Sequence, residues 1–363
     1  MSKIEQITDS HWAELLPRSN PFLKKSFLTA LERSQSIGSS AGWQPLYFTE
    51  PNGLLYTFIK SHSYGEYIFD WDWARAFSQY QLPYYPKLTS MIPLTPVTTS
   101  HFIMPKFEYD IASRLMDSYI SFYENHELSS SHFLFITEEE IPLFENNKHT
   151  IRESFQYHFY NENYATFEDY LLCLKSKKAK NIRLERHFPN LRIEKITSSN
   201  LTKKHADEMY QLYLSTIEVK NAIDYLKEEF FQIVFQEMKD NILFVRASKD
   251  ERIIAGSLFF YDDQRLFGRY WGALEQVENL HFELCYYQGI EFSIEKQLKV
   301  FEAGAQGEHK ISRGFKPVRT FSAHHIKNKD FHHAISNYIS EEKRLIQSTI
   351  EELSKHLPFK KSF

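Results

Sequence analysis

The chain has 363 residues, of which 42% are hydrophobic and 25% are charged, and its formal net charge is −4. These values are typical of a soluble globular protein with a full core and two domains, and they argue against nucleic-acid binding over the whole surface. Any anion site must therefore be local, and DNA is not an expected partner.

The start of the chain and its cysteines indicate a compartment. The first residues, MSKIEQITDSHW, show no signal peptide, and no stretch reaches the roughly 18 apolar residues that a membrane span needs. Cys173 and Cys285 lie in apolar patterns without metal-site spacing, so we interpret them as buried free thiols in a reducing environment. A cytoplasmic location is the expectation.

The first half predicts a hairpin, an extended segment, a helix and a buried strand. The turn signal Pro51-Asn52-Gly53 separates strand-like residues 43–50 and 54–63. Residues 64–73 alternate as in a strand, with rings on one face and acids on the other. The rings are Tyr67, Phe69, Trp71 and Trp73, and the acids are Glu66, Asp70 and Asp72. Further on we expect a helix at 107–125, a strand at 132–137 and a helix start at Thr137.

The second half again alternates helical and strand-like patterns. One long helix is expected over residues 165–188, N-capped by Thr166 and ending before Pro189. Residues 242–274 predict three antiparallel strands joined by polar turns. The other expected elements are strands at 191–197 and 299–305 and helices at 203–219, 227–238, 282–297 and 328–355.

This alternation, without a low-complexity linker, indicates an α/β or α+β protein. The stretch YGEYIFDWDWA is followed by Tyr84-Tyr85, and FGRYWGA is followed after a similar gap by Tyr286-Tyr287. This echo is weak evidence of a duplication. We expect two domains, residues 1–155 and 156–363, with the boundary near residues 150–160.

A basic run at residues 175–187, KSKKAKNIRLERH, carries a local charge of +5. The functional interpretation is recognition of phosphates on a coenzyme, nucleotide, RNA or lipid headgroup, with Lys178 and Arg183 as donor-binding residues. The alternative, favoured equally by charge alone, is a solvated, salt-bridged helix face.

Two aromatic stretches supply candidate substrate-binding residues. In the first, Asp70 and Trp71 would hold a substrate amine through charge and cation–π contact, and the alternative is an ordinary exposed face. In the second, Gly268 and Gly272 indicate a bulge or a close backbone approach, and a helix start follows that favours anions. The second set of candidates is Arg269, Trp271, His281, Glu283 and Tyr287, although Glu283 also fits a simple first-turn acid.

Three of the 11 glycines fall in FEAGAQGEHKISRGFKP, residues 301–317, at Gly304, Gly307 and Gly314. A loop at a strand end is where α/β proteins usually place their chemistry, and we expect the strand to end at Gly304. The candidate general bases are Glu302, Glu308 and His309, and the candidate anion-binding residues are Lys310 and Arg313.

Several cofactor motifs are missing from the sequence. Neither a dinucleotide-binding GxGxxG nor a P-loop is present. The pairs His324-His325 and His332-His333 lack the carboxylate or cysteine spacing of a metal site, so no metal is expected.

Seven stretches taken together resemble the FemAB-like group of predicted N-acyltransferases, labelled as peptidoglycan biosynthesis or recognition proteins, within the GNAT superfamily. The resemblance runs from about Asn20 to about Ile339. The stretches are SHSYGEYIFDW, YYPKL, PLTPVT, KSKKAKNIRLER, GRYWG, HFELCYYQGIEF and FEAGAQGEHKISRGFKP.

The resemblance implies two tandem GNAT-like domains, each a mixed, mostly antiparallel sheet flanked by helices. It also implies an enzyme that transfers an acyl or aminoacyl group to an amine of a cell-wall or peptide-like precursor. The donor would be acyl-CoA, as a co-substrate rather than a bound cofactor, or aminoacyl-tRNA. The usual coenzyme A loop and the long helical hairpin of many FemAB ligases are both missing. The rival interpretation is a non-catalytic module that binds a cell-wall precursor or another polyanion.

Overall fold

The computed structural model of the chain describes Trp12, Leu15 and residues 20–304 and 306–360. Residues 1–11, where no signal peptide is expected, and Ala305 of the glycine-rich stretch lie outside the described residues. The chain forms two compact units: unit 1 is Met1–Ser154 with Arg319–Ser348, and unit 2 is Phe155–Val318 with Thr349–Phe363. Within the described part of the chain, no helix is both long and apolar enough to cross a membrane.

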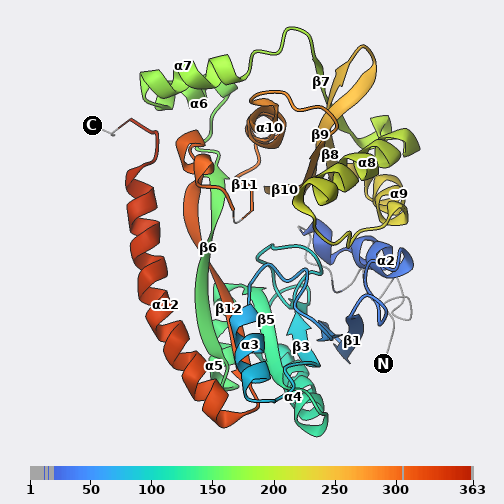
Figure 1. The fold of residues 1–363 in the computed structure, drawn as a ribbon, viewed down its shortest axis with the longest axis vertical. Helices are drawn as coiled ribbons and strands as arrows, with labels where there is room; N and C mark the ends of the chain where they lie inside the picture. The colour runs from blue at the N-terminus through green and yellow to red at the C-terminus, as the bar shows by residue number, and fades with distance from the viewer. Residues whose placement is uncertain (1–11, 13–14, 16–19, 305, 361–363) are drawn as a thin grey trace. The chain divides into compact units, whose positions relative to one another are not determined.

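Unit 1 is a mixed sheet flanked by helices (Figure 1). Its strands lie in the order β1-β2-β3-β5-β12, with β4 beside β2. Only β3 and β5 pair in parallel, and helix α4 connects them. The elements are η2 (Pro21–Leu23), α2 (Lys25–Arg33), β1 (Trp43–Glu50), β2 (Gly53–Lys60), α3 (Trp71–Gln79), β3 (Lys87–Ser90), β4 (Phe102–Ile103), α4 (Tyr109–Asn125), β5 (Ser130–Ile136), η3 (Glu138–Glu140), α5 (Ile141–Asn146), and parts of β6 (Thr150–Tyr160), β12 (Lys316–Ile326) and α12 (Lys329–Lys355).

Unit 2 has the same kind of sheet, with the order β6-β11-β10-β9-β8-β7. Again a single pair is parallel, β10 with β11, and a helical segment connects the two strands. Helix α8 packs on α9 and on β9 and β10 (Figure 1). The elements are α6 (Phe167–Cys173), α7 (Ser176–Glu185), β7 (Arg192–Thr197), η4 (Ser198–Asn200), α8 (Lys203–Lys220), α9 (Glu228–Glu237), η5 (Lys239–Asn241), β8 (Ile242–Lys249), β9 (Arg252–Tyr261), β10 (Arg265–Ala273), α10 (Leu280–Phe282), η6 (Glu283–Tyr287), α11 (Gln288–Glu295), β11 (Val300–Glu302) and η7 (Glu308–Arg313).

The strongest local signals in the sequence are confirmed. Pro51-Asn52-Gly53 joins β1 to β2, and the three antiparallel strands expected at 242–274 are β8, β9 and β10. Thr137 caps its helix through a reciprocal bond with Glu140, and Thr166 accepts from the backbone N–H of Asp169. These signals are local, since a turn or a cap depends on only a few neighbouring residues.

The single long helix expected over residues 165–188 is wrong. The chain forms α6 and α7, and between them Leu174 has an extended backbone that pairs with Phe359. Leu174 is buried in the core of unit 2. Pairing and burial with the distant C-terminal segment therefore override the local helix preference.

The extended segment expected over residues 64–73 is also wrong. Residues 61–70 form an irregular loop, and α3 starts at Trp71. The expected echo with FGRYWGA accordingly pairs a loop with strand β10, so that stretch does not mark equivalent positions. The repeated feature is instead topological, one parallel strand pair with a helical connection in each unit.

The two units are not consecutive in sequence. The expected domains, 1–155 and 156–363, treat the C-terminal part as one body, whereas residues 319–348 group with unit 1. The physical reason is strand pairing, because Phe321 to Ile326 of β12 pair with β5. Composition along the chain cannot predict that a C-terminal strand pairs with the sheet of the first unit.

A close approach of α8 to β10 requires Gly272. A Cβ atom on this residue would lie 1.7 Å from the backbone oxygen of Leu212, and neither backbone can move aside locally. We expect Gly272→Ala to lower the free energy of unfolding by at least about 3 kcal/mol, at the upper end of overpacking effects. Urea unfolding followed by circular dichroism measures this.

The matched control is Gly304→Ala. Gly304 has a φ of +80° but open space around its Cβ position, so only backbone strain of about 1–2 kcal/mol is expected. Equal losses in the two variants would contradict the close-approach argument.

Candidate active site in unit 2 and a buried ionic network in unit 1

The parallel strands of unit 2 separate after a short contact. β11 pairs with β10 over three residues only, ending at Phe267 and Glu302. Beyond that point Ala303 donates to the Tyr157 oxygen at 3.2 Å and Tyr157 donates to the Gly304 oxygen at 3.2 Å, so the chain stays with β6 and leaves β10. The residues that follow β11 therefore start at a fork in the sheet.

β10 continues from the fork with an irregular register. Its pairing with β9 shifts between Gly268 and Tyr270, which makes Arg269 the extra residue of a bulge. The bulge and the close approach expected from Gly268 and Gly272 are both confirmed. The guanidinium of Arg269 lies 5.4 Å from the centroid of the Tyr270 ring.

The helix that connects the two strands contains a π-helical turn. Residues 280–295 run as α10, the π-helical η6 and α11 without a break. The Leu284 carbonyl in this turn accepts a hydrogen bond from Ser257 Oγ of β9 at 2.7 Å. Such π-helical turns are rare in proteins, and those that occur are often found at functional sites. In this protein the turn carries Tyr286, whose hydroxyl group contacts His309. It also carries Cys285, and burial raises the pKa of that thiol.

Histidines and aromatic rings gather at this helix. Tyr286 OH lies 3.0 Å from His309 Nε2. The His281 ring lies 6.1 Å from that of His309 and 5.1 Å from that of Trp271. Burial, with His309 and nearby cations, lowers the pKa of His281 to about 4, and burial with Arg313 and Lys310 lowers the pKa of His309 below 6.5. Both imidazoles are therefore neutral at pH 7, and His309 is the exposed one.

Each glycine of residues 301–317 is explained by its own backbone conformation and surroundings. Gly304, Gly307 and Gly314 all have φ near +80° to +98°. A Cβ on Gly307 would lie 2.4 Å from Cε1 of His309, and a Cβ on Gly314 would lie 2.9 Å from the Phe359 ring. The strand ends at Glu302, two residues before the expected end. Gly307 in particular makes room for the His309 imidazole.

Lys310 and Arg313 are buried beneath His309. Lys310 Nζ donates to the carbonyl oxygens of Gly304, at 3.2 Å, and of Gln306. Burial lowers the pKa of Lys310 to about 8, so its ammonium remains mostly charged at pH 7. Arg313 donates to His309 O at 3.0 Å. These two cations hold the loop and the 3₁₀ turn that carry His309.

The other two candidate bases have surroundings that differ from those of His309. Glu302 is buried on the sheet, where Oε1 accepts from Arg265 at 2.8 Å and Oε2 lies 3.9 Å from His158 Nε2. Glu308 is exposed at the start of η7. Of the predicted catalytic set, only His309 lies with the substrate-binding candidates Trp271, His281 and Lys310.

Several other candidates already have protein partners. Glu283 is buried and accepts twice from Arg186, at 3.0 Å each. Tyr287 donates to Glu185 and accepts from Arg313 Nε at 2.8 Å. These contacts make Glu283 and Tyr287 structural links to α7 and its end.

The basic helix α7 is partly neutralised. Arg183 pairs with Glu168, and Lys178 donates to Ser312 Oγ at 3.1 Å. Lys177 and Lys180 are exposed, and among the described residues neither has an ion pair. Cys173 at the end of α6 is exposed, which corrects the expectation of two buried thiols.

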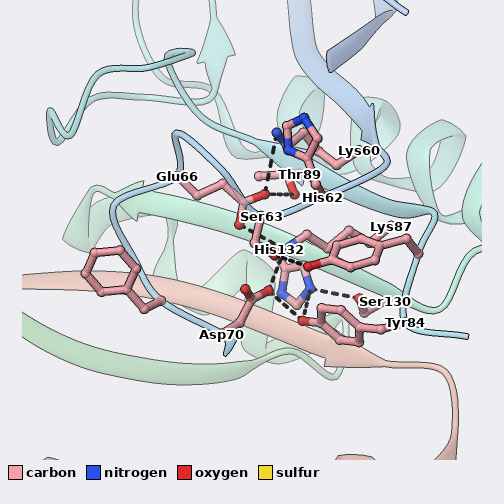
Figure 2. A network of polar contacts seen from close by, with 12 residues as sticks. Lys60, His62, Ser63, Glu66, Asp70, Tyr84, Lys87, Thr89, Ser130 and His132 are labelled. Carbon is pink, nitrogen blue, oxygen red and sulfur yellow. Dashed lines mark hydrogen bonds and ion pairs between the residues drawn. The ribbon is translucent and has the colours of Figure 1, made fainter. Parts of the chain in front are cut away.

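Unit 1 holds a buried ionic network that the sequence interpretation missed (Figure 2). Lys60 and Lys87 face each other in the register of β2 and β3, and both side chains are completely buried. Lys87 Nζ donates to Glu66 at 2.8 Å and to Asp70. Tyr84 donates to Asp70 at 2.6 Å, and Lys60 lies 3.9 Å from Glu66.

The network extends into the sheet through two buried histidines. His132 Nδ1 lies 2.8 Å from His324 Nδ1, and His132 Nε2 lies 2.8 Å from Ser130 Oγ. Burial lowers the pKa of both imidazoles, so they are neutral. Among the described residues, no cluster of histidine, cysteine and carboxylate side chains has the geometry to hold a metal ion.

The network contradicts the proposed amine site at Asp70 and Trp71. Asp70 is buried against Lys87, whereas Asp72 is exposed and pairs with Arg75 at 3.2 Å. Glu66 and Asp70 thus point inward and not outward as expected, because the Lys87 ammonium needs anionic partners once it is buried. The only signal in the sequence was a lysine at the edge of each apolar strand, LLYTFIK and KLTS.

The sequence comparison identifies the family. A model of the FemAB-like family, described as peptidoglycan biosynthesis/recognition, matches residues 3–361. The chain belongs to the FemAB-like family. A search of curated proteins finds no match to this sequence.

Solved structures show the same fold as this FemAB-like chain. FemX superposes with a TM-score of 0.55 at 9% identity, covering 93% of this chain and 99% of FemX. L-PGS from Bacillus licheniformis gives 0.54 at 11% identity, with 90% and 99% covered. The C-terminal domain of an Agrobacterium fabrum protein gives 0.59 at 8% identity, with 92% and 96% covered. The predicted mixed α/β fold is therefore confirmed, and it is the fold of FemX and L-PGS.

The ionic network predicts an unusual pH dependence of stability. Burial lowers the pKa of Lys60 from 10.5 to about 6, so the unfolded chain binds more protons than the folded one between these values. This group therefore makes the protein more stable as pH rises from about 6 to 10, by up to about 1.4 kcal/mol per unit. Lys60→Met should remove that gain.

The measurement is urea unfolding at pH 7 and pH 9, followed by tryptophan fluorescence, because four of the five tryptophans belong to unit 1. The control is Lys106→Met, at an exposed lysine of unit 1, which should keep the wild-type gain. An unchanged gain in Lys60→Met would show that the Lys60 ammonium is not destabilised by burial.

Proposed function

We propose that this FemAB-like chain is an N-acyltransferase that moves an acyl or aminoacyl group from an activated ester or thioester to an amine. The observation that carries the proposal is the fork between β10 and β11, with the neutral, exposed His309 imidazole beside it. The family description supports a cell-wall precursor as the acceptor.

In this proposal His309 is the general base. The amine nitrogen attacks the carbonyl carbon of the donor, a C–N bond forms, and the amine loses a proton to His309. When the Tyr286 oxygen accepts from Nε2–H, Nδ1 carries the lone pair that takes this proton. The C–O or C–S bond to the leaving group then breaks, and His309 returns the proton to the departing oxygen or sulfur.

Lys310 supplies positive charge next to the base. Its two carbonyl partners use two of the three ammonium hydrogens, and its pKa near 8 keeps it charged at neutral pH. A fixed cation near the reacting carbonyl stabilises the developing oxyanion. Lys310 also keeps nearby histidines neutral, since it lowers the pKa values of His281 and His309.

The donor would be held by α7. Lys177 and Lys180 are its exposed lysines, and they suit either the phosphates of acyl-CoA or the backbone of aminoacyl-tRNA. The originally favoured Lys178 and Arg183 are already engaged with Ser312 and Glu168, which makes them positioning residues for the loop and for α6 in this proposal.

Transfer to hydroxylamine tests the chemistry without knowledge of the natural acceptor, because this amine is mostly uncharged at neutral pH. We expect hydroxamate formation from either an acyl-CoA or a charged tRNA. His309→Ala should lower kcat/KM at least about 100-fold, in line with the loss of a general base. The pH profile of the wild-type kcat/KM should fall on the acid side with an apparent pKa below 6.5, and this fall should be absent in His309→Ala.

His333→Ala is the control, at an exposed histidine of α12 in unit 1, and it should retain full activity. If no donor gives product with hydroxylamine or with amine-bearing cell-wall precursors, the protein is not a transferase. Saturable binding of a precursor without turnover would then favour the binding module, which the engagement of Glu302 with Arg265 would suit.

The donor site has its own test. Lys177→Glu with Lys180→Glu should weaken donor binding at least tenfold and reduce its salt dependence, because two phosphate contacts are lost. Lys203→Glu with Lys239→Glu makes the same charge change at exposed positions elsewhere in unit 2 and should have little effect. If calorimetry shows the same loss of donor affinity in both double variants, α7 has no specific role in donor binding and is an ordinary solvated helix.

A further inference from the structure

In loop 61–70 of unit 1, polar residues are buried and aromatic residues are exposed, the reverse of the usual arrangement. Ser63, Glu66 and Asp70 are buried, whereas the rings of Tyr64, Tyr67 and Phe69 are 43%, 40% and 56% exposed. Buried charged groups and exposed large apolar side chains are the departures from ordinary burial that are most informative about function. Both occur here in ten residues.

Two basic side chains, the buried Lys60 and the partly buried Arg152, hold the backbone under two of the exposed rings. Lys60 Nζ donates to the carbonyl oxygen of Tyr64 at 3.2 Å, and Arg152 Nη1 donates to that of Phe69 at 3.0 Å. Arg152 is itself fixed by two bonds to Glu342, at 2.6 and 2.8 Å. The loop is thus fixed at Tyr64 and Phe69, two of the three residues whose rings are exposed.

Further anchors lie between these two points. Lys87 Nζ donates to Ser63 Oγ at 2.8 Å and also binds Glu66 and Asp70 (Figure 2). Buried ion networks are weak sources of stability, because desolvation offsets much of the attraction. Their effect here is rigidity, and a rigid loop loses little conformational entropy when it binds a ligand.

The rings form a continuous strip. The Tyr64 ring lies 5.2 Å from that of His62 and 5.1 Å from that of Trp71. The strip ends beside Asp72 and Arg75, which are exposed and paired at 3.2 Å. Other charged residues of segment 61–75 are buried, so the exposed charge around the strip sums to zero.

We propose that the strip formed by His62, Tyr64 and Trp71 binds the rings of a neutral saccharide, and that the exposed rings of Tyr67 and Phe69 in the same loop add to this binding. The C–H face of a sugar ring is apolar and stacks on an aromatic ring, while its hydroxyls donate to acceptors such as the Asp72 carboxylate and accept from donors such as Arg75. This binding site is independent of the transfer chemistry proposed for unit 2.

Charge and size favour a saccharide over other occupants. A membrane surface with anionic lipids attracts clustered lysines and arginines, and the single exposed arginine of this segment is paired. A stable protein interface uses roughly 20–30 residues on each side, far more than this loop presents.

Calorimetric titration of the full-length protein with chitotetraose, cellotetraose and maltotetraose tests the proposal. We expect saturable binding of at least one of them, and Tyr64→Ala should weaken it at least tenfold. Tyr80→Ala removes a ring that is 72% exposed but lies outside the loop, and it should leave the affinity unchanged. Glu66→Gln should weaken binding without touching the strip, because it loosens the anchor at Lys87.

Three outcomes would overturn the proposal. One is no saturable binding of any of the three sugars to the folded wild-type protein. The second is an equal loss of affinity in Tyr80→Ala. The third is sedimentation with phosphatidylcholine–phosphatidylglycerol vesicles that depends on Tyr64, which would assign the strip to a lipid surface. Thermal unfolding of Tyr64→Ala shows whether the variant is folded, and Phe69→Ala provides a second test at a residue that accepts from Arg152 through its backbone oxygen.

Discussion

Three backbone pairs between β10 and β11 determine where the site of unit 2 forms. Because the pairing ends at Phe267 and Glu302, the chain after β11 follows β6 and leaves β10 free to continue along β9. The glycines then allow a sharp turn, and Gly307 leaves room for the His309 ring. The π-turn brings Tyr286 to that ring from the other side of the fork. Each of these features depends on the strands separating.

Both units place ionisable groups near their parallel strand pair, with opposite consequences. In unit 2 the groups near the fork are the exposed His309 and the buried Lys310, whose ammonium donates to two backbone carbonyl groups of the loop. In unit 1, Lys87 of β3 is enclosed by Glu66 and Asp70 and completely buried. Its charge is used to hold a loop. The same sheet topology therefore carries an exposed histidine in one unit and an enclosed lysine in the other.

Sequence patterns predicted the features that depend on near neighbours. The hairpin at Gly53, the caps at Thr137 and Thr166, and the mixed α/β class all follow from local residues or from alternation along the chain. Long-range pairing was beyond reach, since Leu174 meets Phe359 and β12 returns to β5. The same limit applied to the site: His309, Trp271 and His281 were found by their residue types, but Tyr286 and the partners of Glu283 and Glu302 depend on the tertiary fold. The inward acids of loop 61–70 were misplaced because period-two alternation does not distinguish a strand from a loop anchored by buried lysines.

Acyl transfer at the fork in unit 2 can be tested by a crystal structure with a non-hydrolysable aminoacyl or acyl donor analogue. We expect the carbonyl group of the analogue to lie between β10 and the chain after β11, with its reacting carbon facing His309 and its phosphates toward Lys177 and Lys180. An analogue bound away from this fork, with His309 and Lys310 out of contact, would show that the transfer site lies elsewhere.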